Sequence, residues 1–131
     1  MRRHFLLSVL SVLPVAAALV VSAPALAHPK LVSSQPAANS AVSKPKLISL
    51  TFAEKLVPQF SGFDLVMTGM PGMSDHAPMP ISGFTPIVGP DGKTLSAQLP
   101  RALPAGSYEL NWHAVAADTH RIQGKFVFSV K

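Results

Sequence analysis

Short apolar runs, separated by proline and glycine, constrain this chain more than any other feature. No run keeps a helical period for three turns, whereas alternating or β-branched residues are typical of half-buried strands. Together with the opening segment 28–33, the runs predict an all-β domain of about seven strands, a small β-sandwich or barrel, with the last two strands forming a hairpin around residues 118–121. The other runs cover residues 46–53, 62–68, 94–99, 107–117 and 122–130.

Residues 1–27 have the three parts of a secretory signal peptide. Arg2 and Arg3 precede an apolar stretch over residues 5–21, and the segment closes on Ala25-Leu26-Ala27, a small-x-small cleavage site. A membrane span fits less well, because the stretch is shorter than the roughly 20 residues needed and no basic cluster follows it. We therefore expect cleavage after Ala27, export to the periplasm, and one domain over residues 28–131.

The composition of the mature chain narrows the function classes. Removing residues 1–27, which carry two of the eleven Lys and Arg, leaves 104 residues with nine basic and six acidic side chains, a net charge of +3. That length suits a single domain with a modest core. Without cysteine the domain cannot be held by disulfides and must rely on burial, which suits a periplasmic protein. No Lys/Arg cluster supports nucleic-acid binding, and we expect a soluble product.

Four methionines and one histidine recur at every third position late in the second run and beyond it. They are Met67, Met70, Met73, His76 and Met79. The glycines and prolines among them exclude a helix, whereas a polyproline-like strand would align them and a loop could fold them around one centre. Soft thioether sulfurs with one imidazole select Cu(I) over zinc, magnesium or calcium. The alternative is a methionine-rich core plug or partner loop, but a core strand would show a period of two.

A second set of ligand candidates is built from nitrogen and oxygen. Cleavage after Ala27 would give His28 two metal-binding nitrogens, its α-amine and its imidazole. If Asp118-Thr119-His120 is extended, its carboxylate and imidazole point to the same side, about 6.6 to 6.8 Å apart along the strand. Each motif alone is weak, since His28 could simply suit the signal peptidase and Asp-Thr is common in turns.

The two sets together predict copper in both oxidation states. Cu(II) prefers tetragonal nitrogen and oxygen ligands, which His28, Asp118 and His120 could supply, with Glu54 as an axial or second-sphere group. Cu(I) would bind the methionine segment. With no thiolate in the chain, a copper site here must be built from methionine, histidine and carboxylate.

Three motifs closely resemble the CopC/PcoC family of periplasmic copper-resistance proteins: His28-Pro29-Lys30-Leu31, the segment 67–79, and Trp112-His113 followed by Asp118-Thr119-His120. The resemblance covers essentially the whole mature chain. It implies a seven-stranded Greek-key β-barrel related to cupredoxins, with Cu(I) and Cu(II) sites at opposite ends. It assigns His28, Asp118 and His120 to Cu(II), with Glu54 beside them, and the methionine segment to Cu(I). His76 is displaced by about one residue from the family's usual loop spacing.

We therefore expect a periplasmic copper-binding carrier of copper resistance and homeostasis, and not an enzyme. The resemblance implies an inner-membrane copper transporter and a multicopper oxidase as partners, with copper passed by ligand exchange. Two alternatives remain: an oxygen-activating copper enzyme with an N-terminal histidine site, and an inert immunoglobulin-like adhesion module. Catalysis would need an open coordination position, which Asp118 would occupy.

Overall fold

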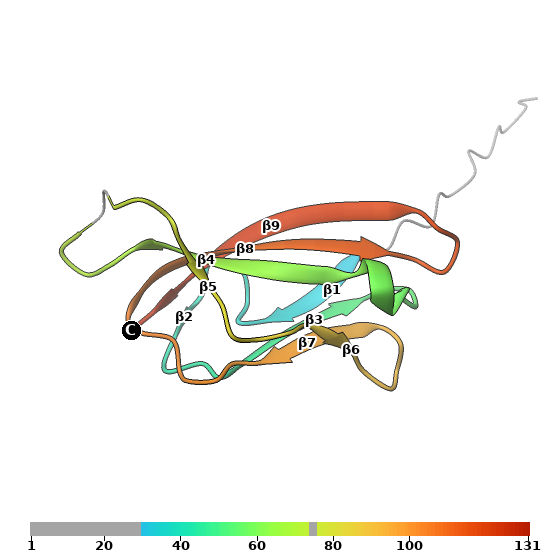
Figure 1. Ribbon diagram of the computed structural model, residues 1–131, viewed down its shortest axis with the longest axis horizontal. Helices are drawn as coiled ribbons and strands as arrows, with labels where there is room; N and C mark the ends of the chain where they lie inside the picture. The colour runs from blue at the N-terminus through green and yellow to red at the C-terminus, as the bar shows by residue number, and fades with distance from the viewer. Residues whose placement is uncertain (1–29, 74–75) are drawn as a thin grey trace, which may run out of the picture.

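The computed structural model describes residues 30–73 and 76–131 and folds them into two facing β-sheets (Figure 1). One sheet has the strand order β1-β3-β7-β6 and the other β2-β9-β8-β4-β5, and every pair is antiparallel except β2 with β9. The strands are β1 Leu31–Gln35, β2 Ala41–Val42, β3 Leu47–Phe52, β4 Gly62–Gly69, β5 Met79–Ile81, β6 Ile87–Val88, β7 Thr94–Gln98, β8 Gly106–Val115 and β9 Arg121–Val130, with one 3-10 turn, η1 Pro58–Phe60.

The all-β prediction is confirmed, and the alternating runs predicted the long strands to within one or two residues at most ends. β3, β4, β7, β8 and β9 lie where the period of two placed them. The described residues hold nine strands instead of about seven, because β2, β5 and β6 contain only two or three residues each. Elements that short carry no periodic signal.

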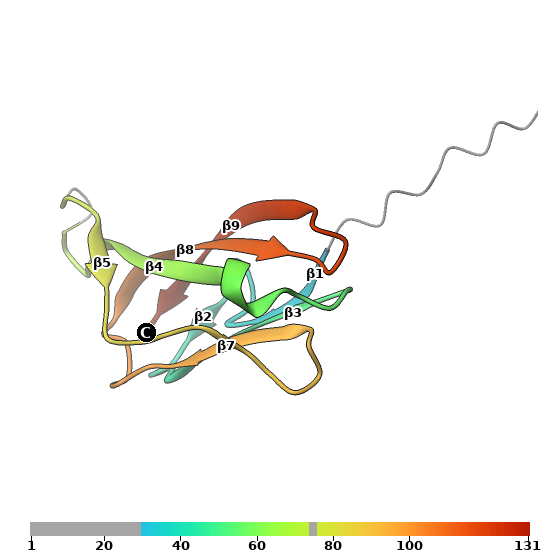
Figure 2. The same ribbon diagram turned by 45° about the vertical axis from the view of Figure 1, so that its right-hand side comes forward.

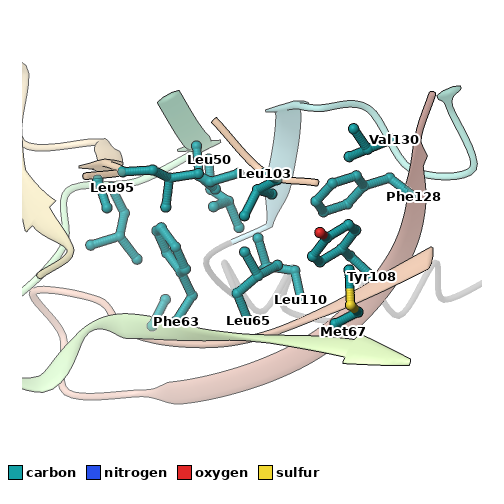
Figure 3. Packing of buried hydrophobic residues seen from close by; sticks show 14 of the residues in the cluster. Leu50, Phe63, Leu65, Met67, Leu95, Leu103, Tyr108, Leu110, Phe128 and Val130 are labelled. Carbon is teal, nitrogen blue, oxygen red and sulfur yellow. The ribbon is translucent and has the colours of Figure 1, made fainter. Parts of the chain in front are cut away.

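The core lies between the sheets and is filled by the apolar faces of the alternating strands. Ile48, Leu50 and Phe52 of β3 belong to the same buried cluster as Phe63 and Leu65 of β4. Figure 3 shows Leu50, Phe63 and Leu65 packed within this cluster. Fully buried aliphatic and aromatic side chains each contribute roughly 1.5–3 kcal/mol, so this cluster is what holds a cysteine-free domain together.

Tyr108 anchors the core at the start of β8. Its ring stacks on Phe128 of β9, with centroids 5.5 Å apart, and its hydroxyl donates a hydrogen bond to the Pro104 carbonyl over 2.7 Å. Burial raises the pKa of the Tyr108 hydroxyl. These contacts of Tyr108 fix the first residues of β8 next to the end of β4, where the methionine segment begins.

The chain connections gather at two opposite ends of the sandwich (Figures 1 and 2). At one end lie the β8–β9 turn, η1, and the start of β1. At the other end lies the connection between β4 and β5. Within residues 30–73 and 76–131 no helix has the length and apolar character needed to cross a membrane. The predicted signal segment, residues 1–27, lies outside the described residues.

Candidate metal sites

Asp118 and His120 lie in the tight turn that joins β8 to β9. The Ala116 N–H donates to the His120 carbonyl over 3.0 Å, the Thr119 N–H donates to the Ala116 carbonyl over 2.9 Å, and Thr119 has a φ of +75°. The hairpin predicted around residues 118–121 is present, since β8 and β9 pair from Val115 with Arg121 onward. The extended geometry considered for Asp118-Thr119-His120 does not occur, because a residue in the left-handed region reverses the chain direction instead of continuing the strand.

The turn brings the two side chains into direct contact. His120 Nδ1 lies 2.9 Å from Asp118 Oδ2, and Asp118 Oδ1 accepts the His120 backbone N–H over 3.1 Å. A carboxylate can only accept when ionised, so Nδ1 is the protonated nitrogen of this pair. In the neutral ring Nε2 then carries the lone pair, and it is the nitrogen suited to a metal.

The Asp118–His120 contact sets the charge of both groups. The hydrogen bond to the Asp118 side chain raises the pKa of His120 above its ordinary value, and the negative charges of Asp118 and, to a smaller extent, Glu54 act in the same direction. The hydrogen bonds from the His120 side chain and backbone lower the pKa of Asp118. Below its raised pKa the imidazole is therefore cationic, and a proton competes with any metal ion for Nε2.

Replacing Asp118 by Asn should lower the pKa of His120 in the metal-free protein, because the hydrogen bond and negative charge that favour the imidazolium are reduced. The raised pKa of His120 contributes stability below its unfolded value of about 6.5, and this contribution is lost as the pH rises through the folded value. The lowered pKa of Asp118 contributes stability at pH values above its unfolded pKa of about 3.9. This contribution is lost as the pH falls through the folded pKa of Asp118. Solvent exposure keeps both contributions small. NMR titration of the His120 ring measures the shift, and an unchanged pKa in D118N would contradict the assignment.

The segment around Glu54 lies against this turn. Leu56 and Ala116 form a β-bridge, and the Ala117 N–H donates to the Lys55 carbonyl over 3.2 Å. On its other side the Ala53 N–H donates to the carbonyl of Lys30 over 2.8 Å. The structure thus brings Glu54, Asp118 and His120 to one end, together with the first described residue.

The fourth predicted ligand of this set, His28, lies outside the described residues. Within residues 30–73 and 76–131, no three His, Cys, Asp or Glu side chains converge into a group able to hold a metal ion. The described part of this end therefore offers an incomplete ligand set.

At the opposite end, Met70 and Met73 are fixed face to face. Each donates its backbone N–H to the carbonyl of the other, over 3.1 and 3.0 Å, and Pro71 and Gly72 form the turn between them, with a φ of +77° at Gly72. Side chains directly opposite each other in an antiparallel pair lie on the same face. Both methionines are exposed, to 41% and 57%, so both side chains reach solvent on the same face of this turn.

His76 in the same loop has one ring nitrogen bound and one without a partner. Nδ1 lies 2.7 Å from the Ala77 carbonyl, which can only accept, so Nδ1 carries the proton. Nε2 is buried and has no hydrogen-bond partner among the described residues. An unpaired buried nitrogen is unfavourable in a protein, whereas an imidazole whose Nδ1–H is held by a carbonyl and whose Nε2 is unpaired is the usual arrangement of a metal-binding histidine.

Met67 and Met79 form a cross-strand pair at the base of this loop. They are directly opposite each other in β4 and β5. Met79 is 43% exposed at the edge of the sheet, while Met67 is only 3% exposed and is opposite Tyr108 on its other side (Figure 3). The structure therefore presents three of the four methionines to solvent and places the fourth in the core.

Two further features of the site carry no simple sequence signal. The Ala77 carbonyl, which sets the tautomer of His76, is a backbone group. Three exposed cations at this end of the sandwich, Lys44, Lys46 and Arg101, come from two separate connections that only the fold brings together. Neither could be found from residue spacing.

The fold and the two ligand sets define a small β-sandwich with an imidazole–carboxylate turn at one end and a methionine–histidine loop at the other. Residues 31–131 match the CopC domain, and the chain belongs to the CopC family. It is 49% identical over 107 residues to copper resistance protein C of Escherichia coli, covering 82% of this chain and 84% of that protein. It is 50% identical over 116 residues to copper resistance protein C of Pseudomonas syringae pv. tomato, covering 88% and 90%.

Solved structures show the same fold. The crystal structure of selenomethionine PcoC, a copper resistance protein from Escherichia coli, matches with a TM-score of 0.73 and 48% identity, covering 79% of this chain and all of that chain. The structure of CopC from Methylosinus trichosporium OB3b matches with a TM-score of 0.66 and 25% identity, covering 79% and 94%. The predicted family and the predicted Greek-key β-sandwich are both confirmed.

Proposed function

We propose that this protein binds copper in the periplasm and carries it between partners, as part of copper resistance and homeostasis. The observation that carries the proposal is the loop between β4 and β5, which holds two paired, exposed methionines and a histidine whose Nε2 has no hydrogen-bond partner among the described residues. Relatives that are about 50% identical are named copper resistance protein C, and these names support the same function.

The Cu(I) site of this proposal is the methionine loop. Met70, Met73 and Met79 supply exposed thioethers and His76 supplies Nε2, a soft set that favours Cu(I) over harder divalent ions. Met67 has a lesser role, because its side chain is packed in the core. It lies opposite Met79 on the neighbouring strand and would bind copper only if the end of β4 moved.

The Cu(II) site of this proposal is the opposite end, completed by His28 after signal cleavage. Only Pro29 separates His28 from Lys30, so their Cα atoms lie within about 7 Å of each other whatever the conformation. The Lys30 carbonyl accepts a hydrogen bond from the N–H of Ala53, which precedes Glu54. The segment that carries Glu54 lies in turn against the Asp118–His120 turn. The α-amine and imidazole of His28 and Nε2 of His120 would bind Cu(II), Asp118 would orient His120 and supply an oxygen, and Glu54 would act as an axial or second-sphere carboxylate.

Transfer would proceed by ligand exchange at the exposed loop. A partner thioether or thiolate can replace one methionine at a time, so copper need not pass through solvent as a free ion. The partners we propose are an inner-membrane copper transporter and a multicopper oxidase. Since both ends act by binding alone, we propose a carrier and not an enzyme.

The proposal predicts that one molecule of processed protein, beginning at His28, holds one Cu(I) and one Cu(II) at the same time. Because the sites lie at opposite ends, loading one should leave the affinity of the other within about twofold. Titration with each ion, alone and after saturation with the other under anaerobic conditions, measures this. Competition of the two ions for a single site would contradict the two-site proposal.

A further inference from the structure

Three exposed cations lie on two connections at the same end of the sandwich as the methionine loop (Figure 1). Lys44 and Lys46 belong to the connection between β2 and β3, and Arg101 belongs to the connection between β7 and β8. Two backbone hydrogen bonds hold these connections together, from Leu99 N–H to the Lys46 carbonyl over 2.7 Å and from Leu103 N–H to the Pro45 carbonyl over 3.2 Å. We call Lys44, Lys46 and Arg101 the cationic rim.

The rim is not neutralised by the part of the chain that the structure describes. None of its three side chains forms an ion pair with a described residue. The Asp and Glu side chains that the structure describes lie elsewhere, at the opposite end or on the outward face of β4 and β8: they are Glu54, Asp64, Asp91, Glu109 and Asp118. Asp75, which falls in the loop by sequence, lies outside the described residues. The rim thus gives this end a positive field.

An apolar hollow lies where Arg101 of the cationic rim meets β5, the strand that follows the methionine loop. Its volume is about 290 Å³, and its walls come from β5 and the connection that carries Arg101. Pro80 and Ile81, which follow Met79 directly, form one wall, while Leu99 and Pro100 belong to the other. A copper-ligand candidate, an apolar hollow and a guanidinium are therefore contiguous at one surface.

We propose that this surface docks an acidic segment of a partner protein that exchanges Cu(I) with the methionine loop. Carboxylates of the segment meet the cationic rim, an apolar side chain enters the hollow, and the partner's copper ligand then lies beside Met79. The inference rests on the proposed Cu(I) loop and adds the chemistry of the partner.

A protein segment fits this surface better than an anionic lipid surface. Three cations near a membrane are worth only about 1 kcal/mol each, too little for stable attachment without an inserted apolar element. The hollow is concave and suits a single side chain of a partner. Insertion into a bilayer would instead need an apolar side chain that protrudes from this protein. Complementary charge of this kind mainly raises the association rate and selects the partner.

The test measures Cu(I) transfer from the loaded protein to two synthetic acceptor peptides. Both carry two methionines and one leucine, and one has four glutamates where the other has four lysines. At low salt we expect transfer to the acidic peptide to be at least about tenfold faster, with the difference falling as ionic strength rises. The double variant K44E/K46E should remove most of that difference, and R101E should reduce it.

The matched control is K55E/K93E, which changes the net charge equally at the opposite end and should retain the preference for the acidic peptide. Equal rates for both peptides, or equal effects of the two double variants, would overturn the docking surface. Binding of metal-free protein to phosphatidylglycerol vesicles that K44E/K46E abolishes would also overturn it, in favour of a lipid surface. Cu(I) affinity of K44E/K46E should match that of the unchanged protein. If the unchanged protein did not bind Cu(I), this result would instead contradict the proposed Cu(I) site in the loop.

Discussion

Replacing Met70, Met73 and Met79 together by leucine is expected to weaken Cu(I) binding by at least about a hundredfold, more than the loss of an outer-shell partner costs in metal sites. Leucine keeps the size and apolar character of methionine but has no sulfur, and all three positions are exposed, so the fold should be unchanged. Competition with a coloured Cu(I) chelator measures the affinity. Cu(II) binding at the other end should stay the same.

Met67→Leu is the matched control for the triple variant. It makes the same chemical change in the same segment, but at a side chain that is buried in the core. A volume-conserving substitution there costs less than about 1.5 kcal/mol of stability, and we expect a much smaller effect on Cu(I) affinity. A triple variant that binds Cu(I) within about threefold of the unchanged protein, a difference of less than 1 kcal/mol, would show that the loop is not the site.

One extra residue before His28 is expected to weaken Cu(II) binding and leave Cu(I) binding nearly intact. The extension converts the α-amine into an amide, which removes one of the two nitrogens that His28 would supply, but keeps the imidazole. Protein with a defined amino terminus, with and without one added alanine, should be compared by Cu(II) competition titration. We expect a loss of at least about tenfold, comparable to the smallest effects of disturbing a metal site.

The added residue also increases steric crowding around the Cu(II) ligands, so the comparison needs a second variant as a control. His120→Ala removes a proposed ligand without changing the amino terminus and should weaken Cu(II) binding in both versions of the protein. Equal Cu(II) affinity for the processed and extended proteins would exclude the α-amine from the site.

The sequence predicted the long strands because a period of two shows which face is buried. It predicted too few strands, since β2, β5 and β6 have only two or three residues each and are set by pairing with β9, β4 and β7 and not by a pattern of their own. Met67 belonged to two patterns at once, the period of three of the ligand candidates and the period of two that it shares with Phe63 and Leu65. Burial shows that the second pattern prevails at this residue.

The candidate sites were predictable as residue types but not as geometry. Asp118 and His120 were found by their spacing, yet the contact between their side chains depends on the left-handed conformation of Thr119, which a β-branched residue rarely adopts. The place of Lys30 beside Ala53, and hence beside Glu54, depends on a hydrogen bond between segments far apart in the chain. Neither signal is local, so neither can be derived from spacing.

X-ray absorption at the copper edge tests the central claim, two chemically different copper sites in one small domain, most directly. Processed protein loaded with one equivalent of Cu(I) should show sulfur scatterers with at most one nitrogen or oxygen in the first shell, at the distances of thioether ligands. The same protein loaded with one equivalent of Cu(II) should show nitrogen and oxygen alone, with the multiple-scattering pattern of imidazole. A first shell of nitrogen and oxygen in both oxidation states would contradict the account.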